Sequence, residues 1–164
     1  MALRTEAYYR EIADAAVRGV GCTEPPVPVE QIVASLGIPI RPVNLPAFFT
    51  AATVYEDGLP VMVVNWANSE QQRRAAIAHM LGHVLLVMKG EGNAYPRDAA
   101  DHSEADVVAR ELVLPTQMVI EQGRLWFNDY RYLARLFAVS EETMLERMRA
   151  MGIIKGPEGM AWDY

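Results

Sequence analysis

The chain has 164 residues, 51% of them hydrophobic, and a formal net charge of -6, so it is long enough for one domain with a core and too short for two of ordinary size. The negative charge disfavours nucleic-acid binding through the overall field, because neutralising phosphates requires clustered Lys and Arg. A single cysteine, no N-terminal signal pattern and no apolar run near the roughly 20 residues that span a bilayer favour a cytoplasmic protein without a membrane segment.

The N-terminal part of the chain predicts two helices followed by a small sheet. Apolar residues recur on one helical face from Arg4 to Val20, and a second short helix spans Val29 to Leu36 and stops at Gly37. From Ile38 to Trp66 short apolar segments flank the turn Glu56-Asp57-Gly58. This pattern predicts about three antiparallel strands.

A long apolar helix is expected next. Its N-cap is Asn68 or Ser69, with Gln71 or Gln72 as the reciprocal capping partner, and it runs to about Met88. Because apolar side chains cover much of its circumference, this helix should be buried between the sheet and other helices.

The remainder of the chain predicts only helices after a turn-rich loop from Lys89 to Arg97. A helix from about Asp101 to Leu114 is followed by three short ones, at 115–122, 128–137 and 140–151, and the last two resemble a helix-turn-helix that can serve as plain structural support. The predicted fold class is α+β, mainly helical, with a small antiparallel sheet packed on the long helix. We expect one domain over residues 1–155 and a flexible tail over 156–164.

The long helix carries His79 and His83, which are four residues apart and therefore point to the same side, where both can bind one metal ion. In the H-E-x-x-H motif of zinc peptidases, the residue after the first histidine is the glutamate that takes a proton from the zinc-bound water. Met80 occupies that position here and can neither accept nor donate a proton.

A tetrahedral zinc site with an open position needs a third protein ligand. Glu104 would complete a His, His, Glu set, although with Asp101 it also fits a capping box. His102 is another possible ligand or oxyanion donor, or an exposed loop residue. Asp106 either orients an imidazole or is a first-turn acid. Glu111, on nearly the same helix face as Glu104, is a reserve ligand or substitute base, or else a surface partner of an arginine.

Four stretches in the same order resemble the ImmA/IrrE family of metallopeptidases, and the likeness covers nearly the whole chain. The first stretch runs from Glu24 to Glu30 and on to Leu36-Gly37-Ile38, and the second comprises Val64-Asn65 and Glu70 through Ala78-His79, continuing as Leu81-Gly82-His83. The third, Glu104 to Pro115, is similar to the family's E-A-N-x-F-A-A-E-L-L-M-P helix. The fourth, Leu133 to Ser140 and on to Gly152, is similar to the closing L-A-x-x-F-x-V-S helices.

The resemblance implies a zincin-like α+β fold with zinc held by His79, His83 and an acidic ligand, for which Glu104 is the matching position. It also implies cleavage of a helix-turn-helix transcriptional repressor, here a separate protein partner. Met80 stands where the family has its glutamate, a loss of general base worth on the order of 100-fold to 10,000-fold in rate. Zinc binding should survive, because that glutamate is not a ligand.

Three hypotheses remain open from the sequence. The first is a zinc-binding member of this family with reduced or lost peptidase activity that acts on a regulator by binding it. The second is an active zinc endopeptidase in which another acid, such as Glu111, serves as the base. The third is a metal-free scaffold for protein interaction.

Overall fold

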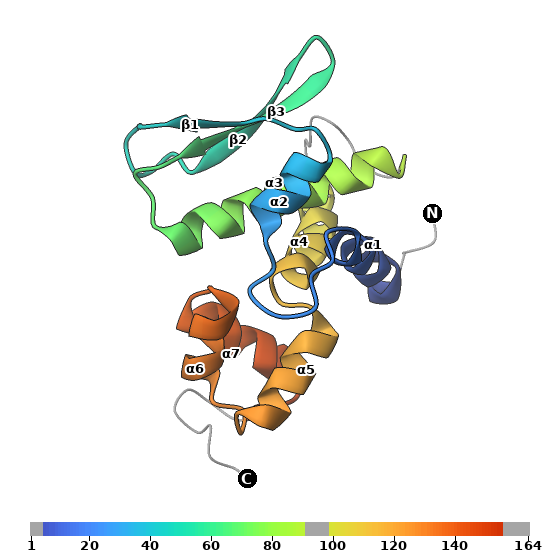
Figure 1. Cartoon of the computed structure of the whole chain (residues 1–164), viewed down its shortest axis with the longest axis vertical. Helices are drawn as coiled ribbons and strands as arrows, with labels where there is room; N and C mark the ends of the chain where they lie inside the picture. The colour runs from blue at the N-terminus through green and yellow to red at the C-terminus, as the bar shows by residue number, and fades with distance from the viewer. Residues whose placement is uncertain (1–4, 91–98, 156–164) are drawn as a thin grey trace.

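The computed structural model describes residues 5–90 and 99–155. A three-stranded sheet lies at one end of the molecule, the long helix α3 runs beneath it, and the other helices extend to the opposite end (Figure 1). The elements in chain order are α1 Glu6–Gly19, α2 Val29–Ser35, β1 Ile40–Val43, β2 Ala51–Glu56, β3 Leu59–Asn65, α3 Glu70–Met88, α4 Ala99–Val113, α5 Thr116–Leu125, α6 Tyr130–Phe137 and α7 Glu141–Ala150.

The sheet has the order β1-β3-β2, so the last strand lies in the centre. β2 and β3 form the predicted antiparallel hairpin, whose turn places Asp57 and Gly58 at positive φ. β1 pairs parallel to β3, with Ile40 opposite Met62, so the expectation of a wholly antiparallel sheet is wrong. Apolar segments and turn residues reveal strands and hairpins, but they do not reveal which strand inserts between two others.

Helix α3 is buried along most of its length, as predicted. It starts with a capping box in which Ser69 Oγ accepts from the Gln72 amide and Gln72 Oε1 accepts from the Ser69 amide. Ile77 and Leu81 are almost fully buried, whereas Met88 at the end of the helix is exposed. The cap fixes where α3 begins, and burial between the sheet and α4 fixes the direction in which its histidines point.

Helices α3 and α4 cross very closely at Gly82. A Cβ atom placed on Gly82 would lie 2.5 Å from the carbonyl oxygen of Ala105, which is itself fully buried. Only a glycine permits this approach of a neighbouring backbone. Because α4 begins at Ala99, Asp101 lies inside the helix rather than at its N-cap, and the capping-box interpretation of Asp101 with Glu104 is wrong.

The C-terminal helices form the predicted helix-turn-helix pair. Asp129 caps α6, Ala138 takes the left-handed conformation in the turn, and Ser140 caps α7. The first turn of α7 exposes Glu141 and Glu142, whose negative charges disfavour contact with nucleic-acid phosphates. The pair therefore suits structural support better than DNA binding.

One hydrophobic cluster runs through the described residues and includes Val33, Leu81, Leu112, Phe137 and Met148. The predicted tail over 156–164 and most of the loop from Lys89 to Arg97 lie outside the described residues. Within the described ranges, no helix has the length and apolar character needed to cross a membrane. The cytoplasmic location stays a prediction.

Candidate metal centre

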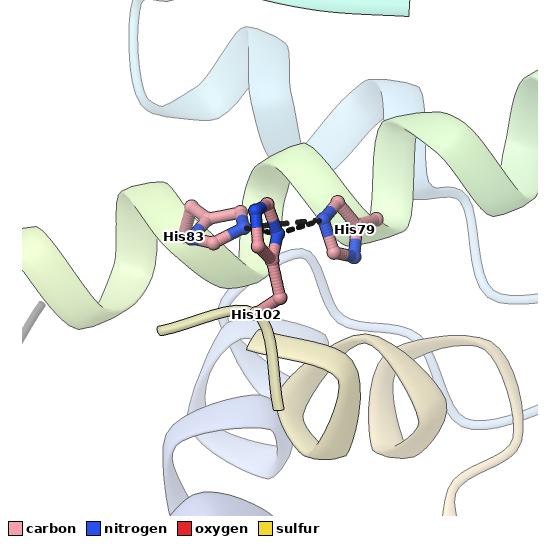
Figure 2. Close-up of side chains that lie close together, drawn as sticks. All are labelled: His79, His83 and His102. Atoms are coloured by element: carbon pink, nitrogen blue, oxygen red, sulfur yellow. Dashed lines mark hydrogen bonds between the residues drawn. The ribbon is translucent and has the colours of Figure 1, made fainter. Parts of the chain in front are cut away.

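Three histidines from two helices converge on one point. His79 and His83 project from α3, and His102 reaches them from the first turns of α4 (Figure 2). His83 Nε2 lies 3.1 Å from His79 Nε2 and 3.3 Å from His102 Nδ1, and the third edge, between His102 Nδ1 and His79 Nε2, measures 3.4 Å. The three nitrogens thus form a nearly regular triangle.

The triangle has the dimensions of one face of a tetrahedral zinc site. With Zn–N bonds of about 2.0–2.1 Å, two imidazole nitrogens on a tetrahedral ion lie about 3.3–3.4 Å apart. A proton can bridge only one pair of the three nitrogens at a time, whereas a metal ion can satisfy all three lone pairs together. Imidazole is also a preferred ligand of zinc. The residues therefore fit the ion that the motif implies.

Asp106 orients one ring of the cluster. It lies on α4 four residues after His102, and its Oδ1 accepts a hydrogen bond of 2.7 Å from Nδ1 of His79. A carboxylate acceptor keeps the proton on Nδ1, which leaves the Nε2 lone pair of His79 directed at the other two histidines. Of the two interpretations of Asp106 open from the sequence, the structure supports the orienting one.

The position of His102 depends on the close crossing of the two helices. Gly82 lies between the two α3 histidines in sequence and lets the α4 backbone pack against α3 at Ala105. This contact brings both His102 and Asp106, one helical turn apart on α4, to the histidine face of α3. The spacing of these two residues in the sequence was the signal that could have ranked His102 above Glu104.

Glu104, expected as the acidic ligand, does not belong to the group of potential ligand atoms in the described residues, which consists of His79, His83 and His102. Its side chain is half-buried. The expectation that Glu104 binds the metal stays a prediction that the geometry does not favour.

Met80 is buried and belongs to the hydrophobic core. The position that carries a general base in the H-E-x-x-H motif is therefore occupied by an apolar side chain packed against other apolar groups. Zinc binding does not require this position, but proton transfer to and from water does.

Glu111 is engaged by other partners. Its Oε1 accepts hydrogen bonds from Arg147 Nη2 at 2.6 Å and from the Thr116 hydroxyl at 2.7 Å, and its Oε2 accepts from the Thr116 amide. Glu111 and Arg147 are both buried, and burial lowers the pKa of the Arg147 guanidinium while the charge of Glu111 raises it. Glu111 thus joins α4 to α5 and α7, and its Oε1 also lies 3.7 Å from Nε of Arg10 on α1, a half-exposed arginine that the sequence did not indicate as its partner.

The fold and the site together define an α+β protein of the zincin type, with a histidine-bearing helix beneath a small sheet. Residues 33–149 match the model of the IrrE N-terminal-like domain, peptidase family M78. The chain belongs to this ImmA/IrrE family, which is of the zinc metallopeptidase type, and the resemblance found in the sequence is confirmed.

The structure is also similar to solved ones. Eleven solved chains match, among them a Mycobacterium tuberculosis transcriptional regulator with a TM-score of 0.61 and 18% identity. That match covers 94% of this chain and 48% of the regulator, so this chain spans about half of the regulator's length. At this identity the likeness shows the fold alone. No curated protein matches the sequence.

Proposed function

We propose that the protein binds zinc through His79, His83 and His102, has reduced or lost peptidase activity, and acts on a helix-turn-helix transcriptional repressor by binding it. The observation that carries the proposal is the triangle of three ring nitrogens, 3.1–3.4 Å apart, next to a buried methionine. His102 takes the place proposed from the sequence for Glu104. Bound zinc would supply Lewis acidity toward a carbonyl oxygen.

The loss of activity follows from Met80. A peptide bond is cleaved efficiently only when a group at the site takes a proton from the attacking water and returns it to the leaving amine. A thioether can do neither. The three histidines would still hold the metal, Asp106 orients His79, and His102 is exposed to solvent.

The active-enzyme alternative requires another base, and Glu111 was the reserve. Both of its oxygens already accept hydrogen bonds, and its charge is paired with a buried guanidinium. Use as a base would leave Arg147 without its partner, which is costly inside a protein. These contacts favour the binding function over the catalytic one.

A substitution that restores the missing base tests this proposal. We expect Met80→Glu to raise the rate of repressor cleavage by about 100-fold or more, the typical contribution of a positioned general base. Because Met80 is buried, the zinc content and urea midpoint of the variant are measured alongside to show that it folds and binds metal. Equal cleavage rates in the parent chain and a folded, zinc-loaded variant would show that the parent is not impaired at this position.

The metal-free alternative has its own test. The protein is purified without added metal, and zinc is then titrated in while thermal unfolding is followed. Stoichiometric zinc and an increase in melting temperature support the zinc proposal. No bound zinc and no shift would leave the scaffold hypothesis as the better account.

A further inference from the structure

The metal centre differs in charge from the set of residues expected from the sequence. A His, His, Glu ligand set with a glutamate base would place two negative charges beside a divalent ion. Here the converging ligands are three imidazoles, neutral when they bind a metal, and Met80 is uncharged. These ligands would therefore leave the charge of a bound divalent ion uncompensated.

Asp106 offsets this charge only in part. Its carboxylate contacts His79 Nδ1, the ring nitrogen that does not belong to the triangle, so the imidazole separates it from the centre. Its side chain is also largely exposed, at 66%, and water screens its charge. Asp106 would therefore neutralise only part of the charge of a divalent ion bound by the three imidazoles.

The open side is accessible to a ligand larger than water. His102 is exposed, and the His79 side chain is 33% exposed, so two of the three imidazoles reach the surface formed by the described residues. A group on another molecule could approach the centre along these exposed imidazoles.

From these observations, which rest on the proposed zinc site, we propose that the fourth position binds a carboxylate of a protein partner, from a side chain or a chain end. A carboxylate is a hard, negatively charged oxygen ligand of zinc. A peptide carbonyl is neutral and gains less from an uncompensated divalent charge. Because a carboxylate is not cleaved, the same chemistry gives a stable complex, consistent with a protein that binds its target.

The size of the charge effect can be bounded. The attraction between two unit charges about 4 Å apart corresponds to about fivefold in affinity in bulk water, and to more in a partly buried site. A charged ligand should therefore bind at least about fivefold more tightly than a neutral ligand of the same shape. Replacing one imidazole by a carboxylate should reduce that preference.

The test uses Co²⁺ as a spectroscopic substitute for zinc, with acetate and acetamide as probes of equal shape. In the Co²⁺-loaded parent chain, we expect acetate to change the visible absorption with at least about fivefold higher affinity than acetamide. His102→Glu should lower the acetate preference, and Glu142→Gln, a control at an exposed glutamate on α7, should leave it unchanged. Three tripeptides distinguish a chain end from a side chain as the source of the carboxylate. One has a free carboxyl end, one has an amidated end, and one has an amidated end and a single aspartate. Preference for the first indicates a chain end, and preference for the third indicates a side chain.

The outcomes separate this inference from the proposed function. Failure of the parent chain to bind Co²⁺ or zinc overturns both. Metal binding with equal affinity for acetate and acetamide in the parent chain overturns the inference alone, whatever the variants do. An unchanged acetate preference in a metal-loaded His102→Glu variant also contradicts it.

Discussion

The close crossing of α3 and α4 gives the sharpest prediction from the packing. In Gly82→Ala, the new Cβ would lie 2.5 Å from the Ala105 carbonyl oxygen, and ordinary contact begins at 3.4 Å, so the helices must separate by about 0.9 Å. Overpacking of this kind costs about 1–3 kcal/mol in the free energy of unfolding. The same separation would move His102 away from the two α3 histidines. It would enlarge a triangle whose edges already equal the distances between nitrogen ligands of a tetrahedral zinc ion.

Two measurements check this prediction, urea unfolding and zinc affinity against a competing chelator. We expect Gly82→Ala to lose stability by that amount and to bind zinc at least about tenfold more weakly, since 1.4 kcal/mol of lost binding energy is a factor of ten. Gly19→Ala, at a helical glycine with no atom within 4 Å of the new Cβ, is the matched control and should change neither quantity unfavourably. Wild-type stability and zinc affinity in Gly82→Ala would refute the role given to the glycine.

Three further predictions concern stability. Glu111→Gln should lower the free energy of unfolding by about 3 kcal/mol in urea titrations, because Arg147 would be left buried without a countercharge; an unchanged midpoint would contradict this. Burial first, and then the charge of Glu111, raise the pKa of Asp14 above 3.8, so its ionised form costs stability as pH rises past that value. Asp14→Asn should therefore have a higher melting temperature than the parent at neutral pH and the same melting temperature well below pH 3.8. A higher melting temperature at low pH alone would contradict this prediction. Asn65→Ala should lower the free energy of unfolding by about 2 kcal/mol or more, because the fully buried side-chain amide accepts from two backbone amides and donates to three carbonyls of the loop before β2. A urea midpoint equal to the parent's would show that the loop does not depend on Asn65.

Local signals predicted much of the fold. The predicted N-cap at Asn68 or Ser69 placed the start of α3 to within one residue, and the apolar circumference of that helix predicted its burial. The order of the strands could not be predicted in the same way, because β1 and β3 pair across an intervening strand. Such pairings depend on the packing of the whole molecule rather than on neighbouring residues.

The candidate site was predicted in part. Helical periodicity was enough to pair His79 with His83, because four residues make one turn. The third histidine, His102, reaches the site because of where α4 starts and how closely it crosses α3. The identities of the ligand residues predict neither of these. For the same reason the sequence could not show that Glu111 faces Arg147, which lies 36 residues away in the chain.

The central claim is that zinc is held by three histidines. The most direct test compares the zinc affinities of His102→Ala, Glu104→Ala and the parent chain. The account predicts that the parent binds one zinc ion per chain, that His102→Ala loses stoichiometric binding, and that Glu104→Ala retains the parent affinity. Loss of zinc in Glu104→Ala with retention in His102→Ala, or a parent chain that binds none, would contradict it.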